Sequence, residues 1–442
     1  MSTAAEPERS RLSTAIRFLS AFRGGALALT VLTLLANAAN YLTNIAFSQL
    51  LNPVGYGELS ALLAIAVVVG MPTSAAQTIV AERVAAHSSR GDVERLRYLI
   101  RHAYAHAITV GLVVAGAYAL CIPLVIKLLD LRFPGPAIAL VPLLVMVFVQ
   151  PVQLALLQGL SRFWALGLTL LALATSRMAF GIALVLLGGG AGAAIGGQVV
   201  GLLVVLTLAA FFTRRHVASA GARAARSGVR RRPTARTTSA TVAFVAFSVL
   251  ANIDVVLGKL ILDPHDAGLY AALATIAKIA MFLPAGLVFM IAPGVARARA
   301  ANENPQGVLR RNAVLVLAVG ALVLAAMAIF PTLIVHLTFG TAYDQIIGSA
   351  WIAAIAGALL SLLYSLCTYS AALGDRRWYL VPVAGIAVQV GMIFAIGDRP
   401  RTVMVAQAVT VGAILVANEL FGRPFLRRDH RTEVGPTPAE AG

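Results

Sequence analysis

The chain has 442 residues, of which 59% are hydrophobic and only 12% are charged. Soluble domains carry about 25% charged residues, so this sequence has too little polar surface to coat a water-soluble protein. The net charge of +17 raises nucleic-acid binding as a function, but no basic groove-reading motif is present and the arginines cluster between apolar runs. We therefore expect an all-α integral membrane protein that does not bind nucleic acid.

Apolar stretches long enough to cross a hydrocarbon core of about 30 Å need about 20 helical residues each. By this measure the sequence predicts about 12 transmembrane helices, and an even number of spans places both termini on one side of the membrane. The predicted spans are 25–50, 57–81, 102–128, 136–159, 163–187, 190–213, 239–262, 267–293, 311–338, 346–372, 377–396 and 401–422.

The first span has features of a cleavable signal peptide, because arginines precede a leucine-rich run that contains Ala36-Asn37-Ala38. The apolar run continues unbroken to Leu51, and this favours an uncleaved helix. With twelve spans, 28 of the 35 basic residues fall on the side that holds both termini. Cytoplasmic loops carry the excess of lysine and arginine, so we expect a multi-pass protein of the plasma membrane with both termini in the cytoplasm.

The loops give no indication of an enzyme. No GxxxxGK[ST], HExxH or GxSxG sequence occurs, so we expect neither catalytic activity nor a cofactor. His102 and His106 have the spacing of metal ligands on a helix, but no third ligand is evident and we expect them to be interfacial residues. Cys121 and Cys367 both lie in apolar stretches, without the spacing of a zinc or redox site.

The longest polar stretch holds eight arginines and divides the spans into two sets of six. We expect it to anchor the chain near anionic lipid, with a regulatory or partner-binding role as the alternative. The predicted organisation is a basic cytoplasmic N-terminus (1–24), a six-helix bundle (25–213), the Arg-rich linker (214–238), a second six-helix bundle (239–422) and a cytoplasmic tail (423–442).

The two bundles share a sequence repeat. Leu50-Leu51-Asn52-Pro53 followed by Gly57 matches Ile261-Leu262-Asp263-Pro264 followed by Gly268, at an offset of 211 residues. Each half holds an even number of spans, so the repeat predicts a pseudo-two-fold axis along the membrane normal. Transporters with such repeats bind substrate where the repeats meet and alternate between inward-open and outward-open states.

Four ionisable residues lie within predicted spans, where a charge is costly and usually marks a pathway or a paired network. From the helical rise we place Arg177, Asp254 and Lys278 roughly 12–17 Å below the outer surface, whereas Lys259 can extend to the outer interface. We expect Arg177 and Lys278 to hold an anionic group in a central, water-filled cavity, with Asp254 balancing them or carrying a proton. The alternative is a buried salt bridge between Asp254 and one of the cations.

Amide side chains also interrupt the apolar spans. Asn37, Asn40 and Asn44 lie on one face of the first span, where they could bind sugar hydroxyls or equally well form interhelical hydrogen bonds. Asn252 and Lys259 are seven residues apart and share a face of the seventh span, which favours a polar lining.

Several stretches resemble the polysaccharide-transporter, or oligosaccharide flippase, family of the multidrug/oligosaccharidyl-lipid/polysaccharide export superfamily. The resemblance covers roughly residues 25–422. It is carried by Asn252-Ile253-Asp254-Val255-Val256-Leu257, Ala267-Gly268-Leu269-Tyr270-Ala271-Ala272, Phe282-Leu283-Pro284, Pro53-Val54-Gly55-Tyr56-Gly57, Phe339-Gly340 with Tyr343, and the stretch from Tyr369 to Gly374.

This resemblance implies two six-helix bundles in a V around a central, often cationic cavity. It also implies that the protein flips a polyprenyl-diphosphate-linked glycan from the cytoplasmic to the outer leaflet of a bacterial plasma membrane, driven by a proton or sodium gradient. The deep cations suit a diphosphate, and Asp254 falls in the signature of the seventh span. Some relatives have fourteen spans, and no specific coupling-ion site can be carried over to this chain.

Three other functions stay open from the sequence. A drug/cation antiporter of the same superfamily would line its cavity with carboxylates and aromatic residues, whereas here Asp254 faces two deep cations. A non-transporting scaffold in cell-envelope synthesis would tolerate neutralisation of these charges. A lipid-linked glycan polymerase usually carries a large outer loop, which this sequence lacks.

Overall fold

The computed structural model describes residues 26–219, 235–284, 288, 291–301, 303–373 and 380–422. Within these ranges the chain forms helices and connecting turns, with no strand. The predicted N-terminal segment (1–24) and tail (423–442) lie outside the described residues. So does most of the predicted linker, since α8 continues to Ser219 and α9 begins at Ala235.

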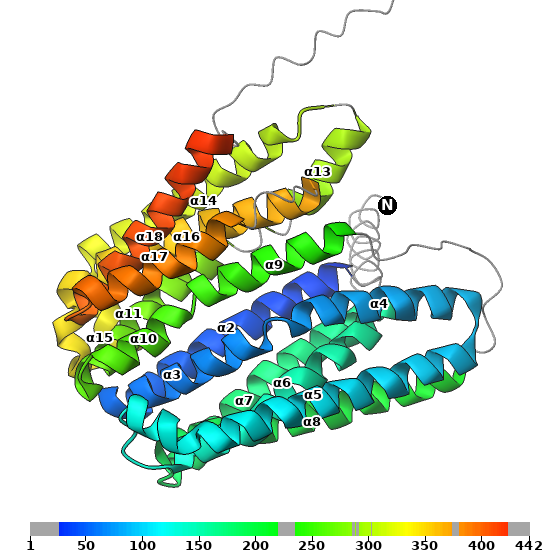
Figure 1. The fold of residues 1–442 in the computed structure, drawn as a ribbon, viewed down its shortest axis with the longest axis horizontal. Coiled ribbons are helices and arrows are strands. Elements are labelled where there is room, and N and C mark those ends of the chain that lie inside the picture. Colours follow the sequence, from blue (N-terminus) through cyan, green and yellow to red (C-terminus); the bar gives the residue numbers. More distant parts are fainter. Residues whose placement is uncertain are drawn as a thin grey trace, which may run out of the picture.

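Two bundles make up the protein, and we call them the N-lobe and the C-lobe (Figure 1). The N-lobe consists of α2 (Ala26–Leu50), α3 (Pro53–Gly70) with its continuation α4 (Thr73–Arg90), α5 (Val93–Leu128), α6 (Gly135–Gly159), α7 (Phe163–Leu186) and α8 (Gly190–Ser219).

The C-lobe follows the same order of spans, but more of them are broken. It consists of α9 (Ala235–Leu250) with α10 (Ile253–Ile261), α11 (Pro264–Phe282) with α13 (Ile291–Ala300), α14 (Gln306–Ile329) with α15 (Pro331–Thr338), the 3-10 helix η2 (Thr341–Ser349) with α16 (Ala350–Leu373), α17 (Leu380–Ile396) and α18 (Pro400–Gly422).

The length and composition of these helices agree with a membrane-spanning protein. In the part of the chain that the structure describes, nine helices are long and apolar enough to cross a membrane, and Val381–Ile396 is a shorter apolar helix. The two remaining spans are α2 and α11. The prediction of an all-α membrane protein with about 12 transmembrane helices in two six-helix bundles is therefore confirmed.

The two lobes repeat the same packing. In the N-lobe α2 packs on α7, α7 on α8, and α6 on both α5 and α8. In the C-lobe the corresponding pairs are α9 on α17, α17 on α18, and α16 on both α14 and α18. Equivalent helices thus have equivalent neighbours, as the predicted pseudo-two-fold axis requires.

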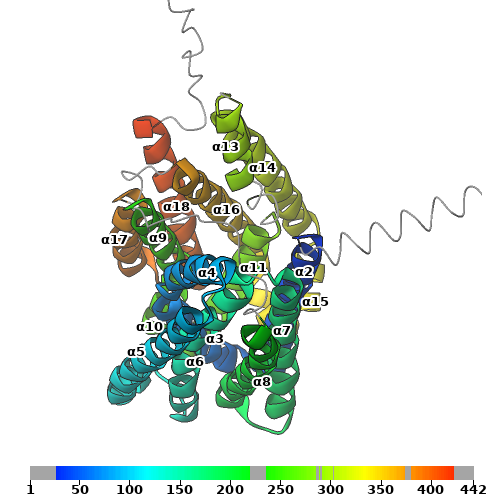
Figure 2. The same ribbon diagram turned by 90° about the vertical axis from the view of Figure 1, so that its right-hand side faces the viewer.

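The lobes meet mainly near one end of the molecule, which we call the short-loop end because the turns 51–52, 129–134 and 262–263 lie there. At this end α3 of the N-lobe packs on α10 and α11 of the C-lobe, and α4 also touches α9 farther along. Towards the opposite end, which holds the start of α2 and the end of α18, the lobes diverge (Figures 1 and 2).

Glycines allow the close approach of α3 and α11. A Cβ atom added at Gly57 would lie 2.9 Å from the backbone nitrogen of Gly268, and one added at Gly268 would overlap the carbonyl oxygen of Pro53. Both helices begin with proline in the first turn, and the side chain of Asn52 caps α3 by accepting a hydrogen bond of 2.8 Å from the Gly55 nitrogen. The repeated turn motif therefore forms the contact between the lobes.

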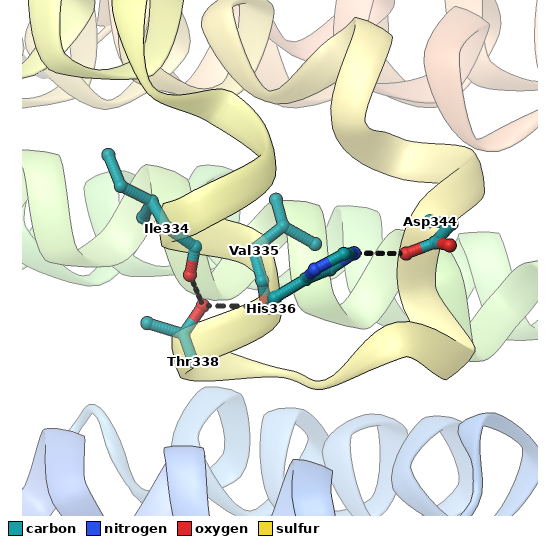
Figure 3. Close-up of polar contacts among 5 residues, drawn as sticks. All are labelled: Ile334, Val335, His336, Thr338 and Asp344. Atoms are coloured by element: carbon teal, nitrogen blue, oxygen red, sulfur yellow. Dashed lines mark hydrogen bonds and ion pairs between the residues drawn. The ribbon is translucent and has the colours of Figure 1, made fainter.

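An elbow between α15 and η2 also lies at the short-loop end (Figure 3). The chain reverses at Gly340, whose φ of +87° is a conformation that glycine adopts without strain. His336 Nε2 and Asp344 Oδ1 are 2.6 Å apart across this reversal, and the Thr338 hydroxyl donates a hydrogen bond of 2.6 Å to the Ile334 carbonyl. The contact between His336 and Asp344 joins the two arms of the elbow, whereas the hydrogen bond of Thr338 lies within α15.

The elbow contacts the end of α2, so it joins the lobes a second time. Gln49 Nε2 donates a hydrogen bond of 2.9 Å to the carbonyl of Leu337. The buried hydroxyl of Tyr343 donates one of 3.2 Å to the carbonyl of Ser48. Within the contact of α3 with α11, the hydroxyls of Tyr56 and Thr275 are 2.7 Å apart and buried.

Candidate functional site

The candidate site begins at a break in the seventh span. Helix α9 ends at Leu250 and α10 begins at Ile253, with Asn252 between them in a non-helical conformation. A break of this kind leaves carbonyl groups without their helical partners. The side chains of Gln389 on α17 and Gln407 on α18 each donate a hydrogen bond of 3.1 Å to the Leu250 carbonyl. Residues far away in the sequence thus satisfy the carbonyl group that the break leaves free.

Asp254 lies in the first turn of α10, directly after this break, and is only 3% exposed. The hydroxyl of Tyr270 on α11 donates a hydrogen bond of 2.5 Å to its Oδ2 atom. Its Oδ1 atom is buried and has no hydrogen-bond partner among the described residues. The carboxylate is therefore fixed on one side and unsatisfied on the other.

Lys278 on α11 reaches the same break from the neighbouring helix. Its Nζ atom donates a hydrogen bond of 3.0 Å to Asn252 Oδ1, and Asn252 Nδ2 in turn donates one of 2.8 Å to the Ser248 carbonyl. Lys278 interacts electrostatically with Asp254 but forms no ion pair with it. The predicted direct salt bridge between Asp254 and a cation is thus absent between these two residues.

Together Asn252, Asp254, Tyr270 and Lys278 form what we call the C-lobe cluster. Three of its members are buried, whereas Lys278 is half-buried. A cation that is held by a neutral amide, and not by a carboxylate, keeps its charge available to a ligand. Of the residues predicted to bind substrate, the structure brings three together here.

The asparagine face of α2 lies towards this cluster from the other lobe. The hydroxyl of Tyr41 donates a hydrogen bond of 3.3 Å to the Lys278 carbonyl, and the Tyr41 ring lies 6.4 Å from that of Phe282. Asn37 and Asn44 share the side of α2 that carries Tyr41, since they lie four and three residues away from it. They therefore face the C-lobe.

The opposite side of α2 packs within the N-lobe, where Ala36 and Ala39 contact Ala174 of α7. Asn44 donates a hydrogen bond of 2.9 Å to the carbonyl of Asn40 in its own helix. The three predicted asparagines make no hydrogen bond to another helix within the ranges given above. The interpretation of these amides as interhelical links therefore receives no support from the structure.

Arg177 lies in a different place. It is on α7 inside the N-lobe, where its Nη2 atom donates a hydrogen bond to Gln198 Oε1 on α8. Its Nε atom is buried without a partner in the described chain. The equivalent helices of the C-lobe, α17 and α18, are joined by the Gln389–Gln407 hydrogen bond. The Arg177 guanidinium of the N-lobe therefore takes the place of the Gln389 amide of the C-lobe. The structure records no contact between Arg177 and Lys278.

Lys259 and Glu58 occupy the interface between the lobes at the short-loop end. The sequence predicts that Lys259 extends to the membrane surface, but its side chain is 2% exposed and its helix α10 packs on α3 of the N-lobe. The difference arises because α10 packs against α3 along this face. Glu58, 4% exposed, is a buried carboxylate that the sequence analysis missed. The sequence could have indicated this residue, because Glu58 lies one position inside the predicted apolar span 57–81.

The sequence matches a known protein family, and the fold is that of solved transporter structures. A family model described as "Polysaccharide biosynthesis protein" matches residues 22–298. The search of curated proteins found no match. Among solved structures, the chain is similar to one titled as the inward-facing conformation of a multidrug resistance MATE family transporter of the MOP superfamily. That match has a TM-score of 0.69 and 13% identity, and covers 88% of this chain and 94% of the other.

Two further structures show the same fold. One is titled as the outward-facing conformation of a MATE family transporter of the MOP superfamily, with a TM-score of 0.57, 12% identity, and coverage of 90% and 94% of the two chains. The other, from Pyrococcus furiosus, has a TM-score of 0.61, 13% identity and the same coverage. Its title states that the reverse polarity of its binding pocket suggests a different function. The described chain resembles the inward-facing structure more closely than the outward-facing one.

Proposed function

The chain belongs to the polysaccharide biosynthesis protein family, in the MOP superfamily of membrane transporters, and we propose that it flips a lipid-linked oligosaccharide or polysaccharide precursor across the bacterial plasma membrane. The proposed substrate is a polyprenyl-diphosphate glycan, moved from the inner to the outer leaflet. Such a molecule carries charge and hydroxyl groups that cannot enter hydrocarbon unaided, whereas its lipid tail can stay in the bilayer.

One observation carries this proposal: Lys278 is a half-buried cation, held by the amide of Asn252 and placed opposite the asparagine face of α2. A phosphate oxygen accepts charge-assisted hydrogen bonds from an ammonium group, so Lys278 can bind the diphosphate. The amides of Asn37 and Asn44 can donate to and accept from sugar hydroxyls. A substrate bound this way would contact both lobes at once.

Alternating access explains how the bound glycan would cross. The lobes are closed at the short-loop end and diverge at the other end. If the lysine and arginine excess is cytoplasmic, the diverging end faces the cytoplasm and the chain is inward-facing. The higher TM-score with an inward-facing relative supports this assignment. Rocking of the lobes would then expose the C-lobe cluster to the outer side.

Other charged groups have supporting roles in this proposal. Arg177 adds positive potential within the N-lobe, where its Nε atom has no partner among the described residues. The unpartnered Oδ1 atom of Asp254 makes this carboxylate the candidate for a coupling proton or sodium ion. The Arg-rich linker, 214–238, is proposed to lie against anionic lipid. Lys259 takes no part in the substrate site.

A drug/cation antiporter is the second candidate, because several structures of the same fold carry titles naming MATE transporters. The charge of the site argues against it, since an organic cation would meet Lys278 and Arg177 inside the protein. A non-transporting scaffold would need no such cations at mid-membrane depth.

Transport by purified protein in liposomes tests the proposal. A fluorescent polyprenyl-diphosphate oligosaccharide is expected to change leaflet with the wild-type protein, and Lys278→Ala is expected to lower the rate by at least about tenfold, since it removes a charge-assisted interaction. Lys127→Ala is the matched control, because Lys127 is exposed near the end of α5. Ethidium in place of the glycan tests the antiporter. Failure of the wild-type protein to move any lipid-linked sugar would overturn the proposal.

A further inference from the structure

A buried charge lies on each side of the lobe interface near the short-loop end. Glu58 is in the second turn of α3 in the N-lobe, and Lys259 is in the last turn of α10 in the C-lobe. The two helices pack directly against each other, and the side chains are 4% and 2% exposed. Neither residue belongs to the substrate site proposed above.

Lys259 lacks the partners that a buried ammonium group normally has. Its Nζ atom is buried and forms no hydrogen bond in the described part of the chain. Glu58 lies on α3, the helix that packs on α10, and Asp130 lies in the turn after α5, so these two carboxylates can act on its charge. Burial of a charge without hydrogen bonds is costly, so the closed interface holds Lys259 in an unfavourable environment that Glu58 only partly offsets.

Glu58, in contrast, is fixed to its own lobe. Its Oε1 atom accepts a hydrogen bond of 3.0 Å from the backbone nitrogen of Arg132, in the turn that joins α5 to α6. The carboxylate therefore moves with the N-lobe, whereas Lys259 moves with the C-lobe. Their attraction acts across the surface that must separate when the short-loop end opens.

We propose that Glu58 and Lys259 form an electrostatic gate that sets how readily the short-loop end opens. This inference rests on the proposed alternating access. In the closed state the attraction between the two charges favours contact between the lobes, whereas the lost hydration of Lys259 opposes it. On opening, both side chains regain water. Because the two effects oppose each other, the pair keeps the free-energy difference between the closed and the open state small.

A thiol at position 48 can report the opening. Ser48 lies in the contact between α2 and the elbow and is 1% exposed, so Ser48→Cys is a nearly isosteric reporter that closure hides. The native cysteines are replaced by Cys121→Ser and Cys367→Ser. The rate of reaction with a water-soluble maleimide is then measured on purified protein in detergent without substrate. Because no glycan is present, the result stands whether or not the proposed transport is correct.

The gate predicts opposite effects for single and double neutralisation. Glu58→Gln keeps an oxygen for the Arg132 nitrogen but removes the buried carboxylate of the pair, which lies across the interface from Lys259, so labelling is expected to rise by at least about tenfold. In Glu58→Gln with Lys259→Met, neither of the two buried charges remains in the interface. Labelling is then expected to return to within about twofold of the wild-type rate, because apolar replacement of a buried pair is often neutral.

Matched controls separate the gate from general damage. Glu82→Gln and Lys127→Met neutralise exposed charges of the N-lobe and are expected to leave labelling unchanged. Should Glu58→Gln not yield folded protein, Lys259→Glu gives the same test, since labelling should rise and an added Glu58→Lys should restore it. Wild-type labelling in Glu58→Gln, or fast labelling that persists in the double variant, would overturn the proposal.

Discussion

The hydroxyl of Tyr270 donates a hydrogen bond of 2.5 Å to Oδ2 of Asp254, and both side chains are buried in the C-lobe. The contact links α11 to the first turn of α10, the part of the seventh span that follows the break, and holds it in place. The Tyr270 ring also lies under Gly258, where a Cβ atom would come within 2.9 Å of it. The orientation of Asp254 therefore depends on this tyrosine.

We predict that Tyr270→Phe lowers the free energy of unfolding in detergent by about 1.5–3 kcal/mol, because a buried carboxylate loses its hydrogen-bond donor. Asp254→Asn combined with Tyr270→Phe should recover part of this loss, since the charge is then removed. Chemical denaturation followed by tryptophan fluorescence measures both. An unchanged Tyr270→Phe variant would show that the bond does not stabilise the fold.

Asn37→Ala with Asn44→Ala is expected to weaken the apparent affinity for a glycan-bearing substrate in the liposome assay by about tenfold, because two hydrogen-bonding amides are lost. Transport of a polyprenyl diphosphate without sugars should stay unchanged, since Lys278 still holds the phosphates. Asn40→Ala is the comparison, because this residue lies at the edge of the face that Tyr41 marks. Equal loss for both substrates would contradict recognition of sugars by this face.

Gly268→Ala is expected to open the short-loop end, because its Cβ atom would overlap the Pro53 carbonyl oxygen. The Ser48→Cys reporter should then react faster with maleimide, by at least about tenfold for a backbone overlap that cannot be relieved by a side-chain rotation. Gly116→Ala on α5 is the control, since no atom lies within 4 Å of its added Cβ. Unchanged reaction at position 48 would mean that the contact tolerates a methyl group without separation of the lobes.

The two glutamines at the break should act non-additively. Gln389→Leu alone leaves Gln407 as donor to the Leu250 carbonyl, and the reverse holds for Gln407→Leu. Each single change also breaks the Gln389–Gln407 hydrogen bond and is expected to cost about 1 kcal/mol of unfolding free energy, whereas the double change should cost about 3 kcal/mol, more than the sum, because a buried carbonyl is left unpaired. Denaturation of the three variants measures the coupling, and simple additivity would argue against a shared acceptor.

Much of the fold was predictable from the sequence, because the length of an apolar run and the repeat of its turns act over short distances. The break before Asn252 was not, since no proline or glycine marks it and the glutamines that satisfy Leu250 lie 139 and 157 residues away. The sequence does contain Pro72 and Pro331, which mark the breaks before α4 and α15.

The candidate site was predictable in part. Depth along a helix placed Asp254 and Lys278 at a similar level inside the protein, where the structure has Asp254 buried and Lys278 half-buried. Depth carries no information on which side of a helix faces which neighbour, so the separation of Arg177 from Lys278 could not be foreseen. Glu58 was hidden for a related reason, since a single carboxylate at the edge of an apolar run resembles a residue at the membrane surface.

The contact at Gly57 and Gly268 has a consequence for how the halves recognise each other. These glycines correspond through the repeat, so each meets its own counterpart, as residues on the axis of a symmetric dimer do. The charges beside them do not correspond, because Leu269 stands at the position of Glu58 and Ser48 at that of Lys259. Two N-lobes would bring two carboxylates together with no ammonium group. The backbone contact alone would allow an N-lobe to bind a second N-lobe, or a C-lobe a second C-lobe. The charges favour the contact of an N-lobe with a C-lobe.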